Sequence, residues 1–290
     1  MVSFTHLLQS LLSGLFLGGI FALLSVGFSL SWGIMKVLNL SHAVFGVLAA
    51  YIAYWLSTRA SVDPLVSLVV IVPLFFLVGI AIYKLLLAPL SRARDLPMAS
   101  TILTFGLAVI VENSMAYAWK PDARVLKTAY IGAALPLGDL PVPLGPFLGF
   151  LLAVVCIGLI YYFLHNTYTG KAVQATWQEP EGAALVGISL GRVSVITFGL
   201  AMASAGVAGV ALAFLYTFYP TVHYVWLLFV FLVAILGGVG SMVGALAGGL
   251  IIGLIFGMAA AFIPFVWVNA VLFALLLAIL LVRPTGLFRI

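Results

Sequence analysis

Apolar runs of about 20 residues recur along almost the whole chain, and they constrain its fold more than any other feature. A helix of about 20 apolar residues crosses the hydrocarbon core of a bilayer. A backbone in lipid must satisfy its own hydrogen bonds, and no alternating strand pattern is present, so these runs predict transmembrane helices. The nine candidate segments cover residues 7–31, 39–57, 65–87, 99–119, 146–164, 193–216, 225–241, 243–262 and 265–282.

Composition excludes an ordinary soluble domain. Of the 290 residues, 65% are hydrophobic and only 7% are charged, whereas soluble domains are about 25% charged. We therefore predict an all-α, polytopic transmembrane helical bundle that forms a single domain over residues 1–290. The first apolar run is much longer than a signal-peptide core, and we expect it to remain as the first span. Eight or nine spans are possible, because residues 237–241 (GGVGS) suit either a tight turn between two spans or a break within one.

The placement of Lys and Arg predicts the orientation, because cytoplasmic loops carry an excess of these residues. With nine spans, the loop 165–192 shares its side with Lys36, Lys84, Arg92, Arg94, Lys171, Arg192, Arg283 and Arg289, and the other side receives Arg59, Lys120, Arg124 and Lys127. This distribution predicts an N-terminus outside, a cytoplasmic C-terminus, a cytoplasmic loop 165–192 and an external loop 120–145. The net charge of +5 is then a topology signal, and no basic soluble face suggests nucleic-acid binding.

The loop 165–192 is a polar island in this apolar chain. Pro180 suits the first turn of a helix, and Glu179 and Glu181 lie where they favour the positive end of the helix dipole. The pattern predicts a short amphipathic helix that ends near Gly187. From these features alone, the loop is either a solvated connection or a docking helix for a cytoplasmic partner.

Four blocks of sequence resemble one transporter family. The segment GKAVQATWQEPEGAALVGISLGRVSVITFGLAMASAGVAG (170–209) is similar to the coupling loop and following helix of the branched-chain amino acid ABC transporter permeases, the leucine/isoleucine/valine type. Three further blocks resemble the same family in order, nearer its shorter permease branch: GLFLGGIFALLSVGFSLSWGIMKVLNLSHAVFGVLAAYIA (14–53), ILGGVGSMVGALAGGLIIG (235–253) and RPTGLF (283–288). The chain departs from the usual family pattern at Ala43, Glu112, Gln174 and Trp177.

The resemblance implies a transport subunit of an ABC importer in the bacterial inner membrane, not an enzyme. Such a permease works with a second similar or identical permease, two cytoplasmic ATPases and an external substrate-binding protein. ATP and Mg²⁺ would bind the ATPases, since this chain has no G-x-x-x-x-G-K-[ST] phosphate loop and binds no cofactor itself. The contact with the ATPases would involve Gln178, Glu179, Pro180, Glu181, Ala184 and Gly187. Branched-chain or related hydrophobic amino acids are the expected cargo; urea, amides and other small amino acids are the alternatives.

A few polar residues within the apolar segments are candidates for the substrate pathway. Glu112 stands out because an ionisable group is costly inside a span. It could meet a substrate ammonium, pair with a basic residue of a partner, or remain neutral in the core; Asn113 follows it. If Glu112 coupled transport to ions, the chain would instead be a secondary transporter. Asn39, Ser41 and His42 lie at the start of the second segment, where Asn39 or Ser41 could cap a helix.

Small residues recur every fourth position near the C-terminal end, a pattern that lets helices approach closely in lipid. They could serve packing within one subunit or between two subunits, and the rows contain Gly240, Gly244, Gly248, Gly249 and Gly253. Histidines are scattered, with no second ligand at metal-binding spacing, so we expect no metal site.

Overall fold

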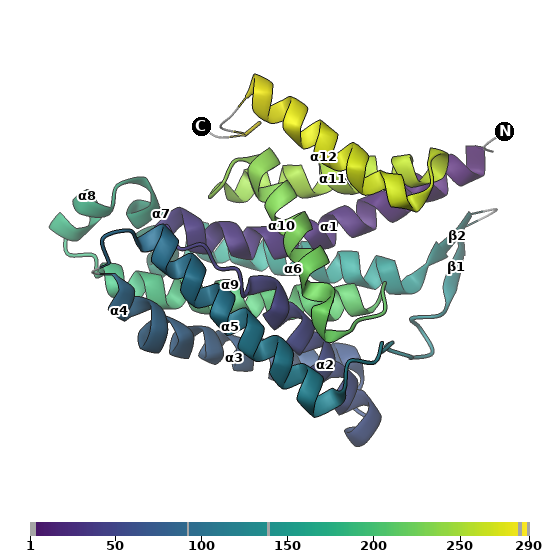
Figure 1. The fold of residues 1–290 in the computed structure, drawn as a ribbon, viewed down its shortest axis with the longest axis horizontal. Helices are drawn as coiled ribbons and strands as arrows, with labels where there is room; N and C mark the ends of the chain where they lie inside the picture. Colours follow the sequence, from purple (N-terminus) through teal and green to yellow (C-terminus); the bar gives the residue numbers. More distant parts are fainter. Residues whose placement is uncertain (1–3, 92, 138–139, 284–285, 289–290) are drawn as a thin grey trace.

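A computed structural model describes residues 4–91, 93–137, 140–283 and 286–288, and its core is an all-α helical bundle (Figure 1), as predicted. Within these residues, eight helices are long and apolar enough to cross a membrane. Seven of them are α1 (Phe4–Met35), α2 (His42–Ala60), α5 (Leu96–Trp119), α6 (Leu144–Asn166), α9 (Leu190–Ala213), α11 (Met242–Phe262) and α3 (Pro64–Ile82), which continues through η1 (Tyr83–Leu87) into α4 (Ala88–Leu90). The eighth joins η2 (Pro220–Val222) to α10 (His223–Gly237).

A ninth apolar helix, α12 (Phe265–Val282), has 18 residues, as few as the shortest of the eight spans. Before it, the chain turns tightly between α10 and α11, with positive φ angles at Gly238 and Gly240. Gly237 lies against Gly244, and Gly248 lies against the carbonyl of Val233, so α11 folds back on α10. Residues 237–241 therefore form a turn between two helices.

Helices α1 and α9 form the centre of the bundle. Helix α1 packs against α11, α9 and α6, while α9 also packs against α2 and α3. Small residues permit this proximity: a side chain at Gly209 of α9 would collide with the backbone of Gly46 in α2. By contrast, α5 lies at the periphery along α2 and keeps most of its apolar surface exposed.

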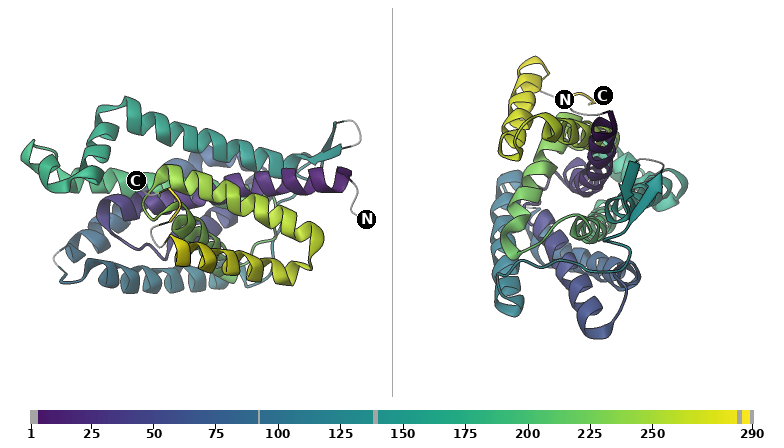
Figure 2. Two further views of the ribbon diagram at one scale, coloured as in Figure 1. Left: turned by 90° about the horizontal axis from the view of Figure 1, so that it is seen from above. Right: turned by 90° about the vertical axis from the view of Figure 1, so that its right-hand side faces the viewer.

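The two ends of the bundle carry different structures (Figures 1 and 2). Helices α7 (Tyr168–Gln178) and α8 (Pro180–Leu185) lie at one end, and the N-terminal end of α1 lies at the other. An antiparallel hairpin of β1 (Ala134–Leu137) and β2 (Leu140–Pro143) lies beside the N-terminal end of α1. The all-α prediction did not include these strands, because they are only four residues long and rich in proline and so carry no alternating pattern.

Several sequence features involve residues outside the described ranges. Arg92 and Arg289, which contribute to the predicted orientation, lie outside them, as does part of the 283–288 block. Within the described part of that block, Leu287 N–H donates to the carbonyl of Leu236 at 2.8 Å. The chain after α12 thus returns to the turn between α10 and α11.

Candidate functional site

Residues 36–41, hereafter the α1–α2 connection, enter the interior of the bundle. His42, the first residue of α2, places Nε2 3.0 Å from the carbonyl oxygen of Leu24. Leu24 lies 11 residues before the end of α1 at Met35, which corresponds to about 16 Å of helix. The chain therefore leaves α1 and runs back beside it before α2 begins. Asn39, like Ser41 and His42, is fully buried.

Two hydroxyls of α5 satisfy the backbone of this connection. Leu38 N–H donates to Ser100 Oγ at 3.3 Å, and Leu40 N–H donates to Thr104 Oγ1 at 3.1 Å. Thr104 Oγ1 also lies 2.9 Å from the carbonyl oxygen of Leu38, to which it can donate. Non-helical backbone at membrane depth needs such partners, because lipid offers none. Sequence reasoning missed both hydroxyls, although their spacing of four residues places them on one face of α5.

The expected side-chain cap of α2 is wrong. Ser41 occupies the N-cap position but has helical angles, φ −77° and ψ −4°, and makes no capping hydrogen bond. N-cap residues usually have extended angles, which direct the side-chain oxygen at the first free N–H groups. The Ser41 hydroxyl donates instead to Asn39 Oδ1 at 2.6 Å, and Asn39 Nδ2 donates to Met202 sulfur at 3.6 Å.

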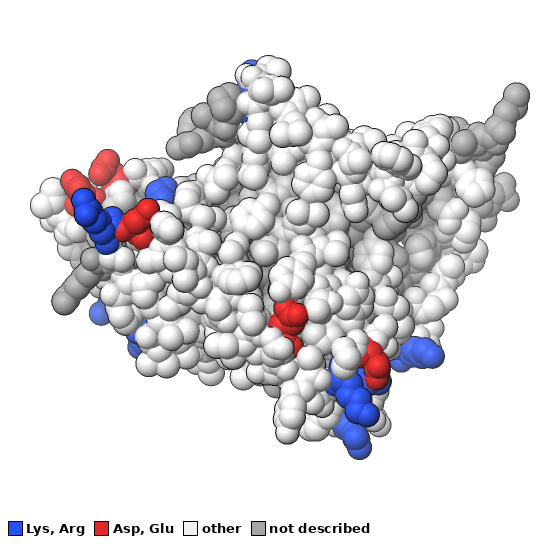
Figure 3. All heavy atoms as spheres, viewed as in Figure 1, with Lys and Arg blue, Asp and Glu red and all other residues white. Residues whose placement is uncertain are grey.

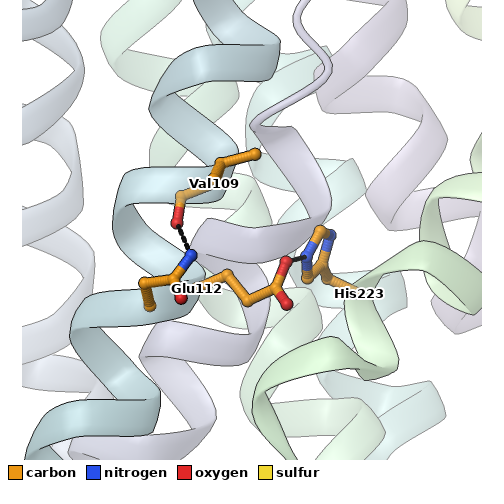
Figure 4. Close-up of polar contacts among 4 residues, drawn as sticks. Val109, Glu112 and His223 are labelled. Atoms are coloured by element: carbon orange, nitrogen blue, oxygen red, sulfur yellow. Dashed lines mark hydrogen bonds and ion pairs between the residues drawn. The ribbon is translucent and has the colours of Figure 1, made fainter.

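A second polar site joins α5 to the start of α10 (Figure 4). Glu112 reaches across from α5, and its Oε2 lies 2.9 Å from His223 Nε2. The His223 side chain is 1% exposed and that of Glu112 is 16% exposed. The ring of Tyr224 lies beside His223, with centroids 4.0 Å apart.

Asn113 lies next to Glu112 but is exposed, and its amide donates to the carbonyl of Val109 on its own helix at 2.8 Å. The five predicted pathway residues therefore form two groups. Thr104 contacts the α1–α2 connection, and Glu112 follows eight residues later, about 12 Å along the same helix. Sequence reasoning missed His223, because it lies two residues before the predicted span 225–241 and so in the preceding connection; the structure begins α10 at His223.

The predicted ATPase-contact residues lie at the free end of the bundle. Pro180 opens α8, Glu181 lies in its first turn, and Gly187 has φ +88° just beyond its end. All six predicted residues are exposed: Gln178, Glu179, Pro180, Glu181, Ala184 and Gly187. Leu185 and Val186 are exposed by 88% and 78%, an apolar tip that the prediction did not include.

Trp177 connects this end to the transmembrane core. The indole Nε1 would lie only 3.2 Å from a side chain placed at Gly33, near the end of α1. The carbonyl of Gly240 lies at the same distance from that position, so Trp177, α1 and the turn at 237–241 meet there. Trp177 is one of the positions at which the chain departs from the usual pattern of the family that the chain resembles.

The glycine rows lie between helices of this chain. A side chain at Gly249 would approach Ala22 of α1 to 2.6 Å, and one at Gly253 would collide with the backbone of Gly18. Gly244 lies against Gly237, and Gly240 lies against Gly33. Because glycines meet at these contacts, the backbone of α11 directly approaches the backbones of α1 and α10.

A family model described as "Branched-chain amino acid transport system / permease component" matches residues 10–280. The chain belongs to this family. No solved structure matches the permease significantly.

Relatives from two bacteria match nearly the whole permease, and an archaeal relative matches three quarters of it. The high-affinity branched-chain amino acid transport system permease protein LivH of Escherichia coli K12 is 26% identical over 98% of this chain and 96% of its own length. The permease protein BraD of Pseudomonas aeruginosa is 25% identical over 97% and 95%. A probable LivH of Methanocaldococcus jannaschii is 26% identical over 75% and 70%.

Proposed function

We propose that the permease is the transmembrane subunit of an ATP-driven importer of branched-chain or related hydrophobic amino acids. The observation that carries this proposal is its similarity to LivH and BraD over 95% or more of both chains. The bundle itself supports a transport role, since its described residues include eight helices suited to crossing a membrane. Catalysis of ATP hydrolysis belongs to other subunits.

The complete importer contains a second permease, two cytoplasmic ATPases that bind ATP and Mg²⁺, and an external binding protein. It lies in the bacterial inner membrane, with the N-terminus of this chain outside and helices α7 and α8 in the cytoplasm. The exposed tip of α8 supports the ATPase contact, because it presents two carboxylates, Glu179 and Glu181, beside the apolar Leu185 and Val186. Apolar anchors with charged neighbours are typical of protein interfaces.

Transport proceeds by alternating access. Closure of the ATPases displaces α7 and α8, and Trp177 passes the displacement to the end of α1 and to the turn at 237–241. Helices α1, α10 and α11 then move as a unit, because their glycine contacts leave no room for independent sliding. The result is a rigid-body change that opens the pathway to one side at a time.

Uptake of radiolabelled leucine tests the proposal in cells that lack their own carrier and express the complete importer. ATP-dependent leucine uptake that requires this chain is the expected result. Accumulation of urea or short amides without leucine would assign another cargo. Leucine uptake that follows an ion gradient and persists without the ATPases would contradict the importer.

Two substitutions test the coupling end. Gly187→Arg forces a left-handed backbone on a residue with a Cβ, and Glu181→Lys reverses a charge in the first turn of α8. Both variants should insert in the membrane and lose uptake while the ATPases still hydrolyse ATP. Asp122→Lys is the matched control, because it reverses an exposed charge in the 120–145 loop at the other end. Unchanged uptake in both α8 variants would remove this segment from the mechanism.

A further inference from the structure

The hydrogen bonds of His223 decide whether it can neutralise Glu112, its partner at 2.9 Å. His223 Nε2 is hydrogen-bonded to Glu112, while its Nδ1 is buried with no partner among the described residues. A protonated imidazole would leave a buried N–H without an acceptor at Nδ1, which is costly. The neutral ring, with its proton on Nε2, leaves only an unused lone pair there. The hydrogen-bond pattern thus assigns a neutral histidine beside Glu112, so His223 brings no positive charge to this carboxyl group.

No Lys or Arg among the described residues lies close enough to balance the charge of an ionised Glu112. Among the described residues, no Lys or Arg nitrogen lies within 4.0 Å of Glu112. Figure 3 shows charged side chains gathered at the two ends of the drawn face, with acidic atoms also near its centre, between α5 and α10. Glu112 is the only acidic residue of α5. An ionised group within a span is costly in lipid, so this position requires water or a cation from outside the chain.

The surroundings of Glu112 suit a zwitterionic solute with an apolar side chain. Tyr224 is 47% exposed, and its aromatic ring lies against the ring of His223, the partner of Glu112. Asn113 uses its amide nitrogen for a single bond to Val109, which leaves the second amide hydrogen available to a carboxylate. Exposed apolar surface lies on α10 at Leu228, one turn after Tyr224 on the same face of the helix.

We propose that Glu112 binds the ammonium group of the transported amino acid, with the Tyr224 ring beside it. An ammonium donates three hydrogen bonds and is attracted both by a carboxylate and by an aromatic face. The proposal rests on the proposed function, because it places the surface between α5 and α10 on the solute pathway. The rival partner of Glu112 is a lysine of the second permease, which would use only the carboxylate. The neighbouring amide and apolar surface are better suited to a complete amino acid.

Charge-selective modification of a single cysteine tests the site without measuring transport. In a Cys156→Ala background, Ser114→Cys places a thiol on the exposed surface of α5, two residues from Glu112. Aminoethyl methanethiosulfonate is cationic and sulfonatoethyl methanethiosulfonate is anionic; their reaction rates are compared in membranes that contain the assembled importer. Adding Glu112→Gln should lower the cation-to-anion rate ratio on the order of tenfold, as expected for a unit charge within several ångströms.

Ile102→Cys is the matched control, because it is exposed on the same helix but about 15 Å from Glu112, beyond the usual screening length. Its rate ratio should not respond to Glu112→Gln. A ratio at Ser114→Cys that ignores Glu112→Gln would show an uncharged pair and overturn the proposal. Complete protection of Ser114→Cys from both reagents would place this surface against lipid or protein, and would also overturn it.

Two probes that share the leucine-like carbon chain identify the ligand group. 3-Methylbutan-1-amine carries only the ammonium, and 4-methylpentanoate carries only the carboxylate. The amine should slow modification of Ser114→Cys, and Glu112→Gln should abolish that protection, while the carboxylate has little effect. Charge selectivity without protection by the amine would overturn the ammonium site. Protection that persists while the importer moves no amino acid would overturn the proposed function alone.

Discussion

Gly249→Ala should destabilise the permease by separating α1 from α11. A Cβ atom at Gly249 would lie 2.6 Å from the backbone nitrogen, Cα and Cβ of Ala22. Ordinary van der Waals contact begins near 3.4 Å, so the two helices must move apart by about 0.8 Å. The obstacle includes backbone of α1, and no rotation of a side chain can relieve it.

The expected cost follows from this displacement. A gap of about 0.5–1 Å forfeits a quarter to a half of the dispersion attraction between the atoms that it separates. Overpacking of this kind usually lowers the free energy of unfolding by about 1–3 kcal/mol. The better helix propensity of alanine raises it by about 0.8–1 kcal/mol. Gly106→Ala is the matched control, because a Cβ at that position of α5 meets nothing within 4 Å. This variant should therefore show only the stabilisation that comes from helix propensity. The two variants should therefore differ by about 1–3 kcal/mol.

Thermal denaturation of the purified chain in detergent, followed by size-exclusion chromatography of the soluble fraction, gives the comparison. Since 1 kcal/mol shifts a midpoint by about 2–4 °C in a protein of this size class, Gly249→Ala should melt several degrees below Gly106→Ala. Equal midpoints would refute the close packing of α1 on α11. They would also remove the steric reason for expecting these helices to move as one body.

Three further substitutions test other parts of the structure. Thr104→Val should cost about 1–3 kcal/mol of stability, because it leaves buried backbone of the α1–α2 connection unpaired; Thr101→Val, which loses only a bond within α5, should cost less in the same melting assay. Burial and the hydrogen bond to Asp63 raise the pKa of Tyr130 to about 12, so this contact should persist at about pH 10, where ordinary tyrosines ionise, and be lost only as the pH rises through 12. Tyr130→Phe should accelerate proteolysis of the 120–145 loop, and the wild-type rate should not rise between about pH 8 and 10. Trp177→Ala should preserve ATP hydrolysis but reduce leucine uptake per ATP; equal ratios would remove Trp177 from the coupling path.

Hydropathy predicted the helices well, because lipid imposes both their length and their composition. All nine apolar segments contain a helix, and most ends agree within a few residues. The second span was placed too early, at residue 39, because Val37, Leu38 and Leu40 are as apolar as the helix that follows. Hydroxyls of α5 accept hydrogen bonds from the non-helical backbone of Leu38 and Leu40 in the interior, and hydropathy does not detect such partners. Helix α7 was missed because the 165–192 island was interpreted from Pro180 and its acidic neighbours.

The polar sites were less predictable, because they depend on contacts between distant segments. Glu112 could be identified from the sequence, since a carboxylate is rare in a span. His223 follows 111 residues later and becomes its partner only when η2, just before His223, packs against α5. The expected cap at Ser41 failed for a local reason, since its helical backbone angles direct the hydroxyl to Asn39.

The two polar sites of α5 have different roles: one stabilises the fold, and the other attracts a charged ligand. In the α1–α2 connection, the amides of Leu38 and Leu40 find their partners inside the chain, on Ser100 and Thr104. Losing such a partner costs stability without changing any charge. An ionised Glu112 instead carries a charge that no described Lys or Arg balances within 4.0 Å. Glu112→Gln should therefore leave the bundle assembled and alter only what the surface between α5 and α10 attracts; a variant that failed to assemble would make Glu112 a structural residue like Thr104.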